Sequence, residues 1–164
     1  SNFASAFNFN PVGALGIFGG SRVKSWRAYV LPIAVMVATD LILAMFNGDE
    51  YGLLHPSRIW VYGCYLIYVL LGRFVVGDSK SPYRIGSATL LGAAQFFLIT
   101  NFCEWIVRPE YTADIWGLLA SYRNAIPFSL NTLAGDLIFT PLAFAAHAYL
   151  TRDAIVTEES LTAA

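Results

Sequence analysis

Residues 85–107, with the sequence IGSATLLGAAQFFLITNFCEWIV, constrain the fold of this chain more than any other stretch. These 23 residues carry one formal charge, Glu104. At about 1.5 Å per residue, a helix of this length crosses the roughly 30 Å hydrocarbon core of a bilayer. Polar residues gather at its end, where Trp105 and the following Arg108 suit a membrane–water interface. We therefore expect one transmembrane helix with a polar end.

The composition indicates that lipid is the solvent for most of the chain. Hydrophobic residues make up 57% of the 164 residues and charged residues 13%, whereas soluble domains average about 45–50% and about 25%. One soluble domain of this length could not bury so much apolar surface. The formal net charge of −1 lacks the basic excess of a nucleic-acid-binding protein. We expect a multi-pass protein of the bacterial inner (cytoplasmic) membrane, without a nucleic-acid partner.

The hydrophobic segments predict an all-α fold, a polytopic transmembrane helix bundle. Four segments are long enough to be firm spans: residues 28–46, 59–76, 85–107 and 130–150. Two more, residues 1–20 and 115–128, are shorter or interrupted by proline and glycine. Each of these two is a short span or a re-entrant helix, so the bundle has up to six spans. Residues 1–150 form a single domain, and residues 151–164 form an exposed polar tail.

The distribution of lysine and arginine predicts the orientation. The loops around residues 21–27 and 73–84 carry six cations, whereas those around 48–58 and 108–114 carry only Arg58 and Arg108. Loops rich in cations stay on the cytoplasmic side, so we place the first pair there. Both termini then lie outside if all six segments span, and inside if the first and fifth are re-entrant.

Three acids lie within the predicted spans: Asp40, Glu104 and Asp136. Each costs about 2.5–3.5 kcal/mol at the bilayer centre, so such a group faces the bundle interior or a cavity and finds a partner. Arg73 and Arg123 are candidate partners, and Glu104 could pair with Arg108 one helical turn away. The acids either hold helices together or line a solute site. For the second case, the predicted substrate-binding set is Asp40, Asn101, Glu104 and Asp136.

His147 is a candidate cofactor ligand. It shares one helix face with Asp136 and Thr140, and a small residue, Ala143, precedes it by one turn. This spacing leaves room for a flat tetrapyrrole beside an axial imidazole. The alternative interpretation is a histidine at the membrane interface, and no cofactor is predicted overall. No metal site is predicted either.

Several stretches together resemble a family of small bacterial polytopic membrane proteins of unknown function. They are NFNPVGAL from residue 8, LP at 31 with TD at 39, FFLITNF at 96 with Trp105, GLL at 117 with Tyr122 and IPF at 126, and NT at 131 with GD at 135. The resemblance implies a bundle with about six hydrophobic segments. This family is in turn distantly similar to the substrate-binding S components of energy-coupling-factor vitamin transporters. In those proteins small residues on a helix face make the coupling contact, and Gly13, Ala14, Gly16 and Gly20 are the candidates here.

Two functions compete. The first is an integral membrane protein that binds a small-molecule solute and works in transport with partner subunits. The second is an accessory or structural subunit of a larger membrane complex, respiratory or photosynthetic, whose helices pack against other subunits, lipids or pigments. No nucleophile–base set is visible, so we do not expect an enzyme.

Overall fold

The computed structural model describes residues 9–47 and 57–162, and the side chains among them except at positions 43, 46, 47 and 153–162. Helices make up the regular structure of these ranges, in agreement with the predicted all-α class. Their bounds are α2 Val12–Arg22, α3 Arg27–Asn47, α4 Arg58–Leu71, the π-helical turn η2 Gly72–Val76, α5 Pro82–Val107 and α6 Ile115–Thr162.

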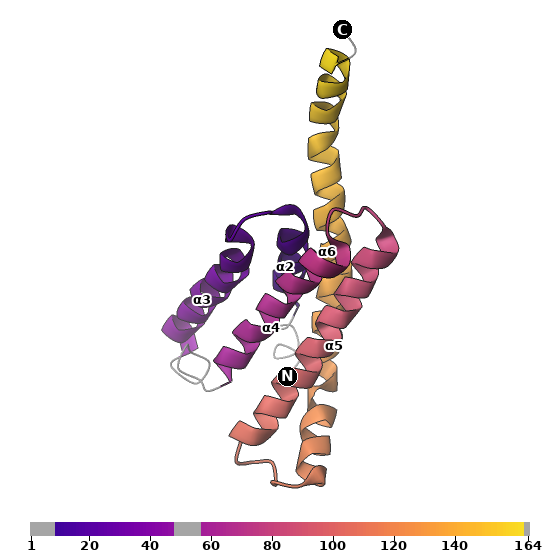
Figure 1. Ribbon diagram of the computed structural model, residues 1–164. Coiled ribbons are helices and arrows are strands. Elements are labelled where there is room, and N and C mark those ends of the chain that lie inside the picture. Colours follow the sequence, from indigo (N-terminus) through magenta and orange to yellow (C-terminus); the bar gives the residue numbers. More distant parts are fainter. Residues whose placement is uncertain (1–8, 48–56, 163–164) are drawn as a thin grey trace.

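The helices run alternately up and down through one bundle (Figure 1). The connections 23–26 and 77–81 lie at the upper end in this view, and the connection 108–114 lies at the lower end. The strongest pairings are α5 with α6, α2 with α4, and α4 with α5. The two loop regions that sequence analysis assigned to the cytoplasm therefore meet at one end, which we call the basic end.

Three helices in the described residues are long and apolar enough to cross a membrane: Arg58–Val76, Pro82–Val107 and Ile115–Arg152. The prediction of four firm spans is thus met for three. The fourth, residues 28–46, lies within the 21-residue helix α3, which contains Pro32 and the buried Asp40 and is not among these three candidates.

The two last predicted segments, residues 115–128 and 130–150, are one continuous helix, which corrects the sequence interpretation. Pro127 and Pro141 lie inside α6 and do not end it. Helix-breaking residues are tolerated in membranes because neighbouring hydroxyl groups take up freed backbone groups. Near Pro127, Ser129 and Thr132 donate to the carbonyl oxygens of Ile126 and Phe128, at 2.8 and 3.3 Å. The carbonyls that lose their helical N–H partner to Pro127 and Pro141 are those of Arg123 and Leu137. The backbone of α6 also stays helical through the predicted tail, as far as Thr162.

The first predicted segment, residues 1–20, lies partly outside the described residues, which begin at 9. Its described part forms the short helix α2, whose 11 residues rise about 16 Å, too little to span. Eight of them are buried, because glycines let neighbouring backbones approach closely. A Cβ at Gly20 would overlap the carbonyl of Val69, and one at Gly72 would overlap that of Ile17. Gly13, Ala14, Gly16 and Gly20 are therefore used inside the bundle, not on an outer coupling surface.

Candidate functional site: a pocket lined by every helix

A pocket of about 900 Å³ lies below the first turn of α2, and all five α-helices contribute to its wall. This volume is in the range of small-molecule sites. Val12 lines it from α2 and Asn10 from the segment before that helix; the Asn10 side chain accepts a 3.0 Å hydrogen bond from the Val12 N–H, which helps to begin the helix. At the other extreme the lining includes Arg108 and Tyr111, at the connection to α6. The pocket therefore extends to the end opposite the basic end.

Asp40 supplies the most buried charge of the pocket, with 1% of the residue exposed. Arg58 Nη1 lies 3.2 Å from its Oδ1, and the Tyr62 hydroxyl donates to its Oδ2 at 2.6 Å. Arg58 and Tyr62 are one turn apart on α4, so a single helix face holds both oxygens of the carboxylate. Asp40 is neutralised by α4, and not by the predicted candidates Arg73 or Arg123.

Glu104 supplies the second acid of the lining, and it pairs, as predicted, with Arg108, the residue that follows the end of α5. The hydrogen bond to the Glu104 carboxylate raises the pKa of Arg108. The described lining residues thus contain two acids and two cations, each acid beside a cation. The pocket wall carries no formal net charge in the described part of the chain.

Asn101 brings an amide group from α5 to the pocket. Its Nδ2 donates to the carbonyl of Phe97 at 2.7 Å, and its own backbone carbonyl accepts a 2.8 Å bond from Ser121. A side-chain amide has two N–H donors and a carbonyl acceptor, and within the described residues Oδ1 and one N–H make no further hydrogen bond. Asn124, which donates to Tyr111 at 3.4 Å, adds a second amide.

Beside several serine and threonine hydroxyls, the wall has a large apolar and aromatic part. Val35 and Met36 come from α3, Tyr65 from α4, and Phe96 and Phe97 from α5. The rings of Tyr65 and Phe96 lie 5.4 Å apart between centroids, a spacing typical of favourable aromatic pairs. The pocket accordingly combines an apolar wall with a few polar groups, the composition expected of a small-molecule site.

Asp136 is not among the residues that line this pocket, unlike Asp40, Asn101 and Glu104. It is buried, and Tyr68 donates to its Oδ2 at 2.5 Å. Gly13, in the first turn of α2, leaves room for Oδ1, because a Cβ there would overlap that oxygen. The carboxylate thus lies beside the positive end of the α2 dipole. This placement fits the alternative interpretation, in which the acid holds helices together.

Arg58 and Tyr62 are the site residues that sequence analysis missed. Arg58 was assigned to a loop, although it is the first residue of α4. The signal that could have found it is the spacing of Arg58, Tyr62 and Tyr65 on one helix face, which places an arginine and two phenols together.

His147 lies near the basic end and is not among the residues that line this pocket. Its ring packs edge-on against Phe18 of α2, with 5.5 Å between centroids. No group of three or more metal-ligating side chains occurs among the described residues, and Cys64 and Cys103 are buried free thiols. Tetrapyrrole binding by His147 stays a prediction.

A family model described as "Family of unknown function (DUF6580)" matches residues 2–159, nearly the whole chain. No curated protein and no solved structure matches this chain.

Proposed function

We propose that this chain, which belongs to the DUF6580 family of unknown function, binds a small solute in the membrane and works with partner subunits in its transport. The observation that carries this proposal is the 900 Å³ pocket lined by every α-helix. A bundle whose acids served only to join helices would need no such space, because protein interiors pack to crystal-like density.

The solute is amphipathic and carries no net charge. A charged solute would leave one charge uncompensated, because the acids and cations among the described residues of the wall already pair one to one. The aromatic wall around Tyr65 and Phe96 takes a ring or short aliphatic body. Asn101 and Asn124 then orient its hydrogen-bonding groups, because a site built to bond polar groups rejects analogues that lack them.

The pocket receives its solute from the non-cytoplasmic side. It extends to the connection 108–114, and the cation-rich connections lie at the opposite end (Figure 1). Cation-rich loops stay in the cytoplasm. This arrangement is the one expected of an uptake component, the role that the resemblance to the S components of energy-coupling-factor transporters implies.

Two neighbouring alanines of α5 provide a test. Ala93 lines the pocket, whereas Ala94 is exposed and does not. The full chain, purified in mild detergent, is screened for small solutes that raise its unfolding temperature, and the hits are measured by equilibrium dialysis. Ala93→Phe fills the pocket and should abolish binding, whereas Ala94→Phe should leave the dissociation constant within about twofold.

Asn101→Ala should weaken binding by roughly 5–30-fold, the effect of about 1–2 kcal/mol for a lost hydrogen bond. The solute-binding proposal would be refuted if Ala93→Phe and Ala94→Phe lost binding equally. It would also be refuted if no compound in a screen of uncharged metabolites bound.

The alternative, an accessory subunit of a larger complex, is favoured by one observation. Helix α6 has 48 residues and is about 72 Å long, more than twice the hydrocarbon core. Figure 1 shows its last turns projecting beyond the bundle. Helices gain most of their stability from packing, so a neighbour would cover this part. Identification of proteins that co-purify with the full chain, but not with a chain ended after Arg152, tests this alternative.

A further inference from the structure

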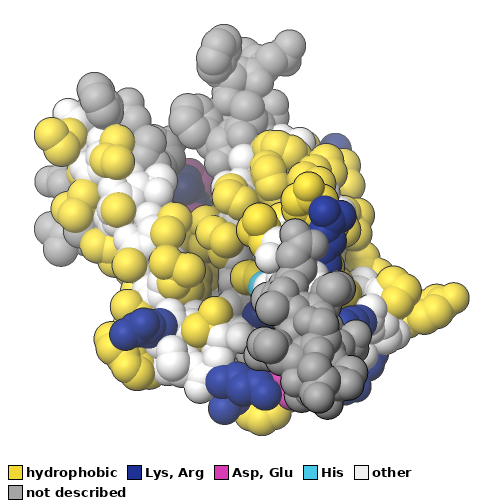
Figure 2. Space-filling model, turned by 90° about the horizontal axis from the view of Figure 1, so that it is seen from above, with side chains coloured by type: hydrophobic (Ala, Val, Ile, Leu, Met, Phe, Trp, Pro, Cys, Tyr) yellow, Lys and Arg dark blue, Asp and Glu magenta, His cyan; other side chains and the backbone are white. Residues whose placement is uncertain are grey.

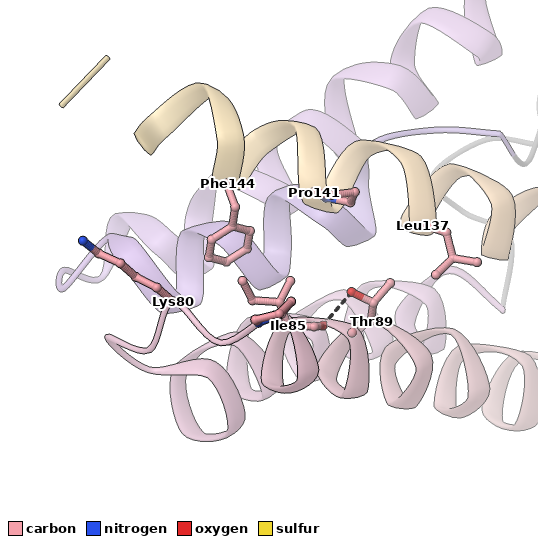
Figure 3. Close-up of a pocket in the computed structure, with 8 residues that line it drawn as sticks. Lys80, Ile85, Thr89, Leu137, Pro141 and Phe144 are labelled. Carbon is pink, nitrogen blue, oxygen red and sulfur yellow. Dashed lines mark hydrogen bonds between the residues drawn. The ribbon is translucent and has the colours of Figure 1, made fainter. Parts of the chain in front are cut away.

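We propose that a second pocket, between α5 and α6 at the basic end, binds an anionic phospholipid of the surrounding leaflet. The pocket has a volume of about 330 Å³ and is shown in Figure 3. It is separate from the solute pocket and shares no lining residue with it. The proposal therefore stands whether or not the chain transports a solute.

The walls of this pocket suit an acyl chain. Ile85 belongs to α5, and Leu137, Pro141 and Phe144 belong to α6. Thr89 also faces the space, but its hydroxyl donates to the Ile85 carbonyl at 2.9 Å (Figure 3), so its hydrogen bond is made within its own helix. Both helices are candidate membrane spans. An apolar groove between two such helices is filled by lipid when no other helix covers it.

Gly86 keeps the floor of the groove open. A Cβ at this position would meet no other atom within 4 Å, although a glycine inside a helix costs about 1 kcal/mol relative to alanine. The space beside Gly86 is thus available to a molecule from outside the chain.

The charge at the mouth selects an anionic headgroup. Lys80 is the one charged residue among those that line the pocket. Arg22 lies nearby, with its guanidinium 5.0 Å above the Phe144 ring. The acid of the adjacent connection, Asp78, is paired with Lys24 at 3.2 Å. Figure 2, which looks onto this end, shows cations beside hydrophobic surface.

Lys80 lies at the membrane depth expected of a lipid headgroup. Lys80 stands two residues before α5, in the connection at the end of the bundle. Basic pockets between transmembrane helices on the cytoplasmic side bind anionic lipid headgroups, and cytoplasmic leaflets are themselves anionic. A free phosphate ion would use Lys80 but leave the apolar walls uncovered, so the lipid is the occupant that satisfies both.

Native mass spectrometry of the full chain with equal amounts of phosphatidylglycerol and phosphatidylcholine tests the proposal. We expect at least threefold more bound phosphatidylglycerol for the unchanged chain. Lys80→Gln should bring this ratio close to one, whereas Lys24→Gln, which removes a cation paired with Asp78 at the same end, should leave it unchanged. Gly86→Leu fills the groove and should remove the bound lipid.

Gly63→Leu is the matched control for the groove, because Gly63 also has no atom within 4 Å of an added Cβ and lines neither pocket. Unfolding temperatures of all four variants within a few degrees of the parent show that the fold is kept. If Gly86→Leu does not fold, lipid crosslinking at position 86 replaces it. Equal retention of both lipids, equal effects of Lys80→Gln and Lys24→Gln, or displacement by millimolar inorganic phosphate would each overturn the proposal.

Discussion

Asp40 and Arg58 form a buried ion pair in the wall of the solute pocket, and the cost of breaking it can be measured. Arg58→Met removes the cation and leaves a carboxylate that is 1% exposed. Breaking a buried pair from one side costs about 3–5 kcal/mol, and we expect about 2–3 here because the Arg58 side chain is 19% exposed. The double variant Asp40→Asn, Arg58→Met should recover at least half of the loss. Unfolding in detergent measures this, and additive losses would contradict the pairing.

A glycine comparison tests the close approach of α2 to α4. Gly20→Ala places a methyl group against the carbonyl of Val69, and overpacking of this kind costs about 1–3 kcal/mol. Gly63→Ala, at an open position of α4, should be neutral or stabilise by up to about 1 kcal/mol. Unfolding temperatures of the two variants in the same detergent distinguish the positions. Equal temperatures would mean that α2 does not pack as described.

At the scale of elements, Asp114 fixes the beginning of α6. Its Oδ1 accepts hydrogen bonds from the Gly117 N–H at 2.8 Å and the Thr112 hydroxyl at 2.7 Å. These bonds lower the pKa of Asp114, the Gly117 bond most. The group therefore stabilises the first turn fully above its unfolded pKa of about 3.9, and the effect is lost as pH falls through the lower folded pKa.

Hydrogen–deuterium exchange of the first turn of α6, corrected for the intrinsic rate at each pH, should show less protection below about pH 3.5 than at pH 6. Asp114→Asn can still accept both bonds and should lose most of this pH dependence. The Asn variant showing the same acid sensitivity as the parent would assign the effect to another group.

A helix could be predicted from the sequence when its own residues determine it, and was ambiguous when contacts with distant residues determine it. Residues 59–76 and 85–107 were found because long apolar helices need only their own backbone hydrogen bonds in lipid. Helix α2 was ambiguous because its position depends on glycine contacts with residues such as Val69, far along the chain. α6 was divided because Pro127 reads locally as a helix end, whereas membrane helices accommodate it.

The same distinction holds for the site. Asp40 and Glu104 were selected because a charge within a span is expensive at any position, and Glu104 has its partner on the same helix. The partner of Asp40 comes from α4, and composition alone favoured Arg73 or Arg123. Asp136 was selected by the same rule, but it lies beside Tyr68 and α2, outside the pocket. A sequence can show that a buried acid needs an ion-pair or hydrogen-bond partner, but it does not show which helix provides that partner.

At the scale of the whole molecule, the sidedness can be measured directly. The natural thiols Cys64 and Cys103 are 1% and 4% exposed, so an added cysteine provides the label site. In intact cells, a membrane-impermeant maleimide should react with Glu110→Cys, beside the solute pocket. Lys24→Cys, at the basic end, should react only after permeabilisation. The reverse pattern would place the pocket on the cytoplasmic side and exclude an uptake component of the proposed orientation.

The burial of α2 has a consequence for how the protein is made. The ribosome synthesises this helix before α3 to α6, yet its packing partners, α4 and α6, come later. With 11 residues it does not reach across the hydrocarbon core. Its contacts with α4 and α6 form only after those helices have been synthesised. Helix α2 is therefore synthesised early but is among the last helices to reach its final position.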